Sequence, residues 1–369
     1  MKKAVIAALA AAIGLSSCGL YDGIDYVDMK LCESIEEHAV RTTEYSEDDV
    51  MEIVHTALAA GKTTVKFDGV VSNDMAQNVI RRIRYECPDV FWTKGFSLAT
   101  DYRSSTLSCD SVHGYDDIKL KEMVSQLAAA VDEVTNGVDE SWSDYDKILY
   151  VHDYILDNCE YDYEAAASES DDIIGFAGTS YGCLIEHKAI CEGYAQAFDL
   201  IMRRLGFDCG MASGMAGGEL HAWNYIKADG KYYWLDVTWD DNMTENGSDH
   251  SPRYKFFMLN DQLFLNGKTL CDDVPFIPHC DALEDNYYVH NGLYIDEYDF
   301  GTVNGLMIDH YDDGGLDIMF ADGESYTAAL NDLMENGSIW QTQPMLDGHE
   351  PAPYYPDEKM HTLTMSWSI

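Results

Sequence analysis

Three residues with the chemistry of a thiol-based acyl-transfer site occur in order within residues 183–241. Cys191 begins a run with helical apolar spacing, His221 begins a strand-like run, and Asp236 lies in the run that returns. A thiolate can attack a carbonyl carbon, and an imidazole can take and return the proton. A carboxylate can fix the tautomer of that imidazole. The stretch therefore predicts a Cys-His-Asp catalytic site.

The segment after Cys191 predicts a helix that ends before Gly206. Apolar residues recur there at helical spacing, at Tyr194, Phe198, Ile201 and Leu205. Cys191 is then at the helix N-terminus, where free N–H groups and the helix dipole stabilise a thiolate. The backbone N–H of Cys191 is one candidate oxyanion donor, and Tyr181 is the candidate for the second.

The segment from His221 to Trp239 predicts a β-hairpin around Asp229-Gly230. If these two residues form the whole turn, Trp223 pairs with Asp236. His221 and Asp236 are then diagonal neighbours on one face, roughly 7 Å or less apart between Cβ atoms. A slip of one residue would put them on opposite faces, and a three-residue turn with a bulge could restore the pairing. The sequence leaves the turn type open.

The same residues, with their neighbours, resemble the transglutaminase-like superfamily as found in exported bacterial proteins. The matching segments are 180–182, 188–195, 218–224 and 233–240, with a lead-in at 150–162. The resemblance covers about residues 143–280. It implies an α+β fold with a transglutaminase-like (papain-like) core, in which a nucleophile helix packs on an antiparallel sheet, flanked by small α+β domains.

The resemblance also implies a function and a set of site residues. Cys191, His221 and Asp236 would act on amide bonds of a peptide or protein substrate through a thioester acyl-enzyme. The outcome would be peptide or isopeptide hydrolysis, or acyl transfer to an amine. His187 departs from the pattern, which favours a small residue such as Gly; this is either neutral or narrows the cleft beside the nucleophile.

A non-catalytic interpretation stays open beside the enzymatic one. A Cys at a helix start is commonly a small buried apolar residue. The domain could then be catalytically inert and serve as a protein- or glycan-binding module, or the flanking domains could make the protein a scaffold. Unreactive Cys191 in a folded protein would favour this interpretation.

The N-terminus predicts export and a lipid anchor. Lys2 and Lys3 precede an apolar run, and Leu15-Ser16-Ser17-Cys18 resembles a bacterial lipobox. Cys18 would be lipidated and residues 1–17 removed, which places the protein at a bacterial membrane in the cell envelope. An ordinary secretory signal is the alternative. No later segment has the apolar length of a membrane span.

Composition excludes several classes of partner. The chain has 23 Lys and Arg against 66 Asp and Glu, a net charge of −43. Such a surface repels nucleic acid and anionic membranes, so no nucleic-acid partner is expected. No cofactor is expected either. One loop is rich in acidic and amide side chains: Asp240, Asp241, Asn242, Glu245, Asn246 and Asp249. It could hold calcium but lacks the spacing of an EF-hand, so a solvated loop is the preferred interpretation.

The remaining cysteines fit no zinc pattern, since the chain has no C-x-x-C. Beyond Cys18 and Cys191 there are eight, which allow 105 disulfide connectivities. Cys87 with Cys109 is one guess within a domain.

The elements predict five segments along the chain. They are a signal peptide with the lipobox Cys (1–18), a tether (19–44), an N-terminal α+β domain (45–136), the transglutaminase-like domain (140–281) and a C-terminal α+β domain (282–369). Helices are expected after Ser46, from an Asn73 cap and after Ser143. Another is expected over 116–134, with an apolar face of Ile118, Met123, Leu127 and Val131. Strands are expected at 63–67, 91–92 and 97–106. A hairpin around Asn291-Gly292, a helix over 325–334 and a strand over 360–369 complete the expectations.

Overall fold

The computed structural model describes residues 9–13, 44–241, 253–351 and 354–368. The fold is α+β, as the sequence predicts. The chain forms two compact units, one of Met1–Asn224 with Thr269–Ile277 and one of Tyr225–Lys268 with Pro278–Ile369. Among the described residues, no helix is both long enough and apolar enough to span a bilayer.

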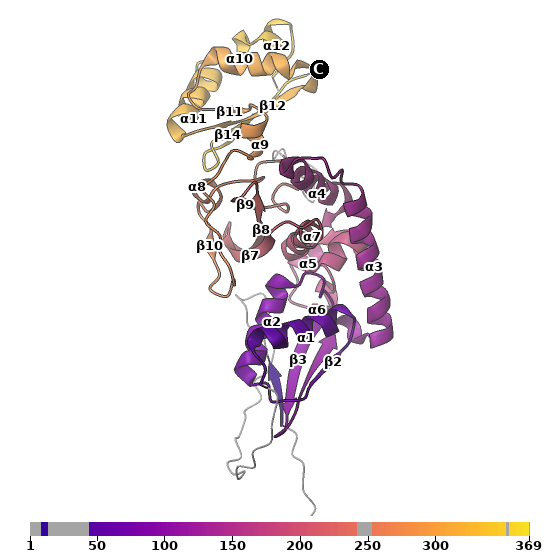
Figure 1. The fold of residues 1–369 in the computed structure, drawn as a ribbon. Coiled ribbons are helices and arrows are strands. Elements are labelled where there is room, and N and C mark those ends of the chain that lie inside the picture. The colour runs from indigo at the N-terminus through magenta and orange to yellow at the C-terminus, as the bar shows by residue number, and fades with distance from the viewer. Residues whose placement is uncertain (1–8, 14–43, 242–252, 352–353, 369) are drawn as a thin grey trace, which may run out of the picture. The chain divides into compact units, whose positions relative to one another are not determined.

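The N-terminal part of the first unit combines helices with a four-stranded sheet of order β1-β3-β4-β2. Its elements are β1 (Leu9–Ile13), α1 (Glu47–Ala59), β2 (Thr64–Phe67), α2 (Asn73–Glu86), β3 (Thr93–Thr100), β4 (Ser105–Ser111), η1 (Val112–Gly114) and α3 (Asp117–Asn136). Figure 1 shows α1 and α2 lying beside each other at this sheet.

Local capping explains where these helices begin. Ser46 and Asp49 form a complete capping box at α1, as its position before an acidic first turn predicts. The cap of α2 is Ser72, whose side chain accepts from the N–H of Met75, so the predicted Asn73 cap is one residue late. Both helices therefore follow rules that act over one turn of chain.

Two predictions in this part are wrong. The predicted strand at Phe91-Trp92 is absent: both side chains are buried, but the strand β3 begins only at Thr93. Ile118 was assigned to the buried stripe of α3, yet it is 82% exposed, and Leu120 is buried instead. Ile118 lies in the first turn of α3, and the buried stripe of the helix begins at Leu120.

β1 falls inside the segment predicted to be a signal peptide. It pairs antiparallel with β3, from Leu9 opposite Thr100 to Ile13 opposite Phe96. Cleavage before Cys18 would remove β1 and leave β3 as an edge strand of a three-stranded sheet. Cys18 itself lies outside the described residues.

The rest of the first unit positions the candidate site. It contains α4 (Asp144–Asn158), β5 (Glu160–Tyr161), α5 (Tyr163–Ala166), α6 (Asp171–Ile174), η2 (Gly182–Glu186), β6 (Lys188–Ala189), α7 (Cys191–Arg204), β7 (Cys209–Ala216), the first part of β8 (Glu219–Ala228) and β10 (Thr269–Leu270). Ser143 caps α4 through the N–H of Asp146, as predicted. One sheet has the order β10-β7-β8-β9, and α7 packs on β7.

The second unit has its own sheet, of order β11-β12-β14-β13. Its elements are the end of β8, β9 (Lys231–Leu235), α8 (Asp261–Phe264), α9 (Tyr287–His290), β11 (Tyr294–Ile295), α10 (Phe300–Asp309), η3 (Tyr311–Asp313), β12 (Gly315–Phe320), α11 (Gly323–Leu330), η4 (Asn331–Glu335), η5 (Ser338–Gln341), α12 (Gln343–Leu346), β13 (Tyr355–Asp357) and β14 (Thr362–Ser366). The helices α10 and α11 contact β12 (Figure 1).

The predicted hairpin over 287–295 is wrong. Residues 287–290 form the helix α9, because the Asn286 side chain caps it by accepting from the N–H of Tyr288. Asn286 also donates from Nδ2 to the carbonyl of Phe257, and Tyr287 stacks on Tyr254 with ring centroids 4.0 Å apart. These contacts outweigh the Asn291-Gly292 turn signal, and β11 pairs in parallel with β12 instead.

Candidate active site

Cys191 is the first residue of α7, as the apolar spacing predicts, and its side chain is 6% exposed. The N-cap of this helix is Ile190, whose side chain cannot accept a hydrogen bond from the first turn. The N-caps of α1, α4 and α8 are instead Ser46, Ser143 and Asn260, whose side chains accept from first-turn N–H groups. An apolar cap leaves first-turn N–H groups available to an anionic ligand, which is what an oxyanion-binding helix start needs.

The start of α7 is packed tightly enough to require Gly193. A Cβ at this position would come within 2.4 Å of the Ala177 carbonyl and 2.8 Å of the Ala189 side chain. Ala177 and Ala189 therefore pack directly against the first turn of α7. Any side chain at position 193 would displace the start of the helix.

His187 occupies a backbone conformation that explains why the superfamily pattern favours glycine there. Its φ is 58° and its ψ 27°, which is the left-handed region. The side chain is exposed, and its Nδ1 lies 2.9 Å from the carbonyl oxygen of Asn158. This hydrogen bond holds a non-glycine residue in the turn before β6.

A buried ion pair fixes the first turn of α7 from the N-terminal part of the unit. Arg84 of α2 donates from Nε to Glu192 Oε1 at 2.9 Å and from a terminal nitrogen to Oε2 at 3.1 Å. The two side chains are only 17% and 11% exposed. This bidentate pairing with the guanidinium fixes the orientation of Glu192, the residue next to Cys191.

His221 is a buried residue of β8, with 6% of its surface exposed. Asn224, three residues further along, donates from Nδ2 to the carbonyl of Ala195 at 2.9 Å and that of Gly210 at 3.3 Å. Ala195 is one turn after Cys191. One buried amide thus ties β8 both to the nucleophile helix and to β7.

The hairpin turn that the sequence left open has two residues. β8 ends at Ala228 and β9 begins at Lys231, with φ of 48° at Asp229 and 84° at Gly230. Positive φ at both central residues is the requirement of a type I′ turn. The rings of Tyr225 and Trp234, paired in this register, have centroids 6.1 Å apart. The register with Ala228 opposite Lys231 is therefore the one adopted.

Asp236 directly follows β9, so the prediction that it lies within the strand is wrong by one residue. Its side chain is 0% exposed and its Oδ1 accepts from the N–H of Trp239 at 3.1 Å. Its own N–H donates to the carbonyl of Phe256. The carboxylate is thus held at the start of a short turn rather than on the pleated surface.

Lys268 is a buried neighbour of Asp236 that the sequence did not reveal. Its Nζ lies 3.6 Å from Asp236 Oδ2, and the side chain is 3% exposed. The ammonium also lies 3.3 Å from the ring centroid of Phe264 and 4.4 Å from that of Trp239. Burial lowers the pKa of Lys268 to about 8, against the opposing effect of Asp236. The protonated Lys268, held between aromatic rings, therefore keeps a positive charge beside the Asp236 carboxylate.

We expect Lys268 to make stability rise between about pH 8 and the ordinary lysine pKa of 10.5. Below pH 8 both folded and unfolded chains hold the proton, so Lys268 adds no pH dependence. Above it the unfolded chain binds more protons than the folded one, so the free energy of unfolding rises with pH, by about 3 kcal/mol over the window. Urea denaturation of wild type and Lys268→Met over pH 7–11 measures the difference.

The matched control for Lys268→Met is Lys231→Met, because Lys231 is an exposed lysine that pairs with Glu284 in the same unit. Its removal should leave the rise between pH 8 and 10.5 in place. A Lys268→Met protein whose stability follows pH as the wild type does would contradict the assignment.

Tyr181, the candidate second oxyanion donor, is buried before η2. Its hydroxyl donates to Gln126 Oε1 at 2.8 Å, and its ring stacks on Phe91 with centroids 4.7 Å apart. An oxyanion role would require this hydroxyl to leave Gln126, so the role stays a prediction.

The cysteines clarify two further predictions. Cys87 and Cys109 are both free, so a disulfide between them is ruled out; Cys87 ends α2 whereas the Cys109 thiol donates to the carbonyl of Asp110 on β4. Cys271 is disulfide-bonded. The acidic loop, for which the sequence favours a solvated loop over a calcium site, falls mainly on residues 242–252, outside the described part of the chain.

Among the described residues, one group of side chains could hold a metal ion. The ligand atoms of His55, Cys87 and Asp89 all lie within 4.8 Å of one another, and His55 Nε2 is 2.9 Å from both Asp89 oxygens. The hydrogen bond to Asp89 raises the pKa of His55. A nitrogen, a sulfur and an oxygen donor suit zinc.

Comparisons with known proteins give a family match and similar curated relatives. Residues 129–238 match the family model described as the transglutaminase-like superfamily. The kyphoscoliosis peptidases of Mus musculus and Homo sapiens are 28% and 29% identical over 42% and 41% of this chain. The matched part is about a quarter of either peptidase, at 25% and 24% of their lengths.

Two solved structures are also similar to the chain. The crystal structure of a TGase covers 52% of this chain and 54% of its own, at 18% identity and a TM-score of 0.31. The periplasmic domain of TgpA from Pseudomonas aeruginosa, bound to ethylmercury, covers 38% and 58%, at 15% identity and a TM-score of 0.23. The family match, which contains Cys191, His221 and Asp236, makes residues 129–238 a domain of the transglutaminase-like superfamily, whose members are often cysteine-dependent enzymes that act on amides.

Proposed function

We propose that the protein is a cysteine-dependent enzyme that acts on amide bonds of peptides or proteins. The observation that carries the proposal is the start of α7, where Cys191 follows an apolar N-cap and β8 is held alongside by Asn224. Cys191 would supply the nucleophilic thiolate, and the N–H groups of the first turn would bind the oxyanion. His221 would take the thiol proton and return it to the leaving amine.

The two-residue turn at Asp229-Gly230 supports a role for Asp236 as the partner of His221. Asp236 directly follows β9, and in the register that this turn sets its position lies opposite Trp223, two residues from His221 on β8. The carboxylate would then fix the imidazole tautomer and stabilise the imidazolium that forms in the reaction. Lys268 would help to hold Asp236 ionised, because it places a cation 3.6 Å from Oδ2.

The reaction would proceed in two steps. Attack of the Cys191 thiolate on the amide carbonyl forms a carbon–sulfur bond, and collapse of the tetrahedral intermediate breaks the carbon–nitrogen bond and releases a protonated amine. The resulting thioester is then attacked by water, which gives hydrolysis, or by a second amine, which gives acyl transfer. Access of water to the thioester decides between the two outcomes.

We further propose that the protein works outside the cytoplasm, lipidated at Cys18 and held at a bacterial membrane. The sequence of residues 1–18 supports this, and the disulfide at Cys271 is of the kind that persists in oxidising compartments. Peptides and proteins of the cell envelope would then be the substrates within reach.

The test is alkylation at pH 7 with an iodoacetamide probe, followed by peptide mapping of the folded protein. Cys191 should be labelled at least tenfold faster than the other free thiols, because a helix N-terminus stabilises its thiolate. The buried thiols of Cys87, Cys109 and Cys280 provide internal controls, since burial raises the pKa of each well above its ordinary value.

Equal labelling of Cys191 and these controls in the folded protein would contradict the enzymatic proposal. It would favour the alternative, an inert transglutaminase-like domain that serves as a protein- or glycan-binding module.

A further inference from the structure

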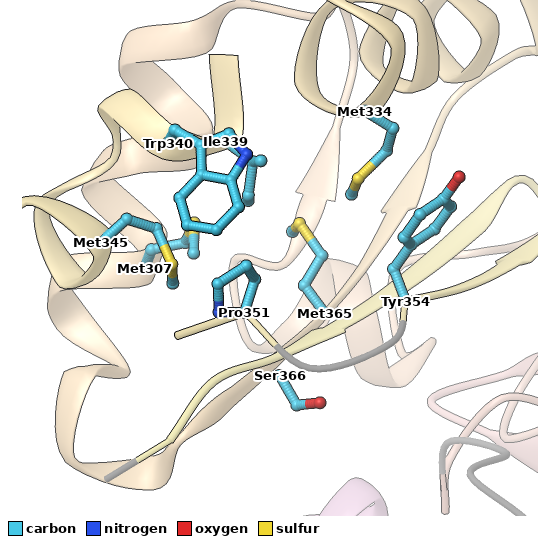
Figure 2. A pocket seen from close by; sticks show the side chains of 9 residues that line it. All are labelled: Met307, Met334, Ile339, Trp340, Met345, Pro351, Tyr354, Met365 and Ser366. Carbon is cyan, nitrogen blue, oxygen red and sulfur yellow. The ribbon is translucent and has the colours of Figure 1, made fainter. Parts of the chain in front are cut away.

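The second unit contains an open apolar cavity of about 210 Å³, and none of the residues proposed for catalysis lines it. Four methionines, an isoleucine, a tryptophan and a tyrosine form most of its wall: Met307, Met334, Met345, Met365, Ile339, Trp340 and Tyr354. They come from α10, η4, η5, α12 and β14, and Tyr354 directly precedes β13. Figure 2 shows the thioether side chains around one space, with Trp340 and Tyr354 on opposite sides.

The size of this cavity suits one large side chain better than a metabolite. Sites for small molecules commonly measure about 300–1,000 Å³. A space of roughly 150 Å³ already accepts a benzene molecule. About 210 Å³ therefore accommodates a single aromatic ring or branched aliphatic group, which is the size of one anchoring residue of a bound chain.

The wall and rim have the composition of an adaptable binding surface. Methionine side chains are flexible and polarisable, so a cavity lined with them can fit anchors of different shape. Trp340, which lines the cavity, is 59% exposed, and Ile308 and Leu346, each next in the chain to a lining methionine, are 45% and 65% exposed. Large apolar side chains left in water beside an apolar cavity are typical of a protein-binding site.

The chain segments that line the cavity carry acidic side chains but no Lys or Arg. Residues 286–358 contain fifteen Asp and Glu and no Lys or Arg. Four of the acidic residues are exposed and lie within two positions of a cavity-lining residue: Asp309, Glu335, Asp347 and Glu350. An apolar anchor that enters the cavity therefore brings its neighbours into a strongly negative field, which attracts cations.

We propose that this cavity docks a cationic amphipathic segment of a partner protein, with one large apolar side chain in the cavity and Lys or Arg residues against the acidic rim. Apolar anchors with basic neighbours are a known way for helices to bind methionine-lined grooves. A second copy of this chain is disfavoured as the occupant because its equivalent surface carries the same negative charge. Anionic lipid is disfavoured for the same reason.

The probe is a fluorescent amphipathic peptide made only of Leu and Lys, about 15 residues long. Fluorescence anisotropy with the full chain should show saturable binding that weakens as salt increases. Two matched peptides separate the contribution of charge from that of apolar contact. A peptide with Glu in place of every Lys and one with Ser in place of every Leu should each bind at least tenfold more weakly.

Protein variants locate the binding on the second unit. Trp340→Ala should weaken binding of the Leu/Lys peptide about tenfold or more, because an exposed tryptophan at such a rim is a typical binding hot spot. Trp142→Ala, which removes a 36% exposed tryptophan from the first unit, is the matched control and should leave the affinity unchanged. Both residues are at the surface, so neither variant threatens the fold.

Charge reversal provides an independent test. Asp347→Lys with Glu350→Lys should weaken binding and flatten its salt dependence, whereas Glu297→Lys with Glu358→Lys, also exposed but further along the chain from the lining residues, should change it much less.

Three results would overturn the proposal. They are equal affinity of Trp340→Ala and wild type, equal effects of the two charge reversals, and tight binding of the Ser-containing peptide, which would mean attraction by net charge alone. Self-association of the wild-type chain that Trp340→Ala abolishes would assign the cavity to a second copy instead.

Discussion

Replacement of Cys191 by alanine is expected to lower amide turnover by about 10⁴-fold or more while leaving the fold intact. Removing the sulfur removes the only group proposed to bond to the substrate carbon, so no thioester can form. The change should fall on kcat rather than on substrate binding. Release of fluorescein from labelled casein measures hydrolysis, and incorporation of a dansylated amine into casein measures acyl transfer.

The matched control is Cys109→Ala, which removes another buried free thiol of the first unit. It should keep wild-type turnover. His221→Ala and Asp236→Ala should each lose turnover too, and combining them with Cys191→Ala should add little, because the three residues are proposed to act as one unit. Turnover that persists in Cys191→Ala would sink the proposed mechanism.

Replacement of Arg84 by methionine is expected to destabilise the folded chain by about 3–5 kcal/mol, the second large effect. It would leave the Glu192 carboxylate, 11% exposed, without its two charge-assisted hydrogen bonds from Arg84. The double variant Arg84→Met with Glu192→Met should recover most of the loss, because it leaves no buried charge unpaired. The midpoint of urea denaturation measures both.

Arg82→Met serves as the control for Arg84→Met. Arg82 also belongs to α2 and pairs with Glu86 and Asp48, but its side chain is 28% exposed and that of Asp48 88%. Ion pairs of this kind contribute about 1 kcal/mol or less. If Arg84→Met were no more destabilising than Arg82→Met, the pair would not be what holds the first turn of α7.

The position of Arg84 also links stability to the candidate site. It joins the N-terminal part of the first unit to the residue beside Cys191, and further hydrogen bonds follow the same course, from Tyr85 to Ser213 on β7 and from Ser180 to the carbonyl of Pro88. The small α+β part at residues 45–136 therefore supports the helix on which the proposed nucleophile lies.

Local rules let the sequence predict the elements that carry the candidate catalytic residues. The apolar spacing after Cys191 marks the helix α7, and Gly206, with its φ of 90°, lies just past its end. Asp229-Gly230 forms the turn between β8 and β9. These signals act over one helical turn or two residues, so neighbouring residues in the chain are enough to determine them. The α+β class and the superfamily followed from the same stretch.

Where a local signal competed with tertiary contacts, the tertiary contacts decided. Asn291-Gly292 is a turn signal, but the cap and hydrogen bond supplied by Asn286 made the preceding residues helical. Ile118 has the residue type of a core position, yet the buried stripe of α3 begins at Leu120. Such outcomes depend on which surface each element meets, which the spacing of residues in one segment does not specify.

By itself, then, the sequence determined which side chains could form a thiol site and which elements carry them. Only the tertiary structure decided what surrounds them, because the partners are far apart in the chain: Arg84 and Glu192 are separated by 108 positions, and Lys268 lies 32 positions beyond Asp236. The burial that makes such pairs matter arises only when the segments pack. A charge is costly inside a protein unless it is paired, so packing, not local sequence, selected these neighbours.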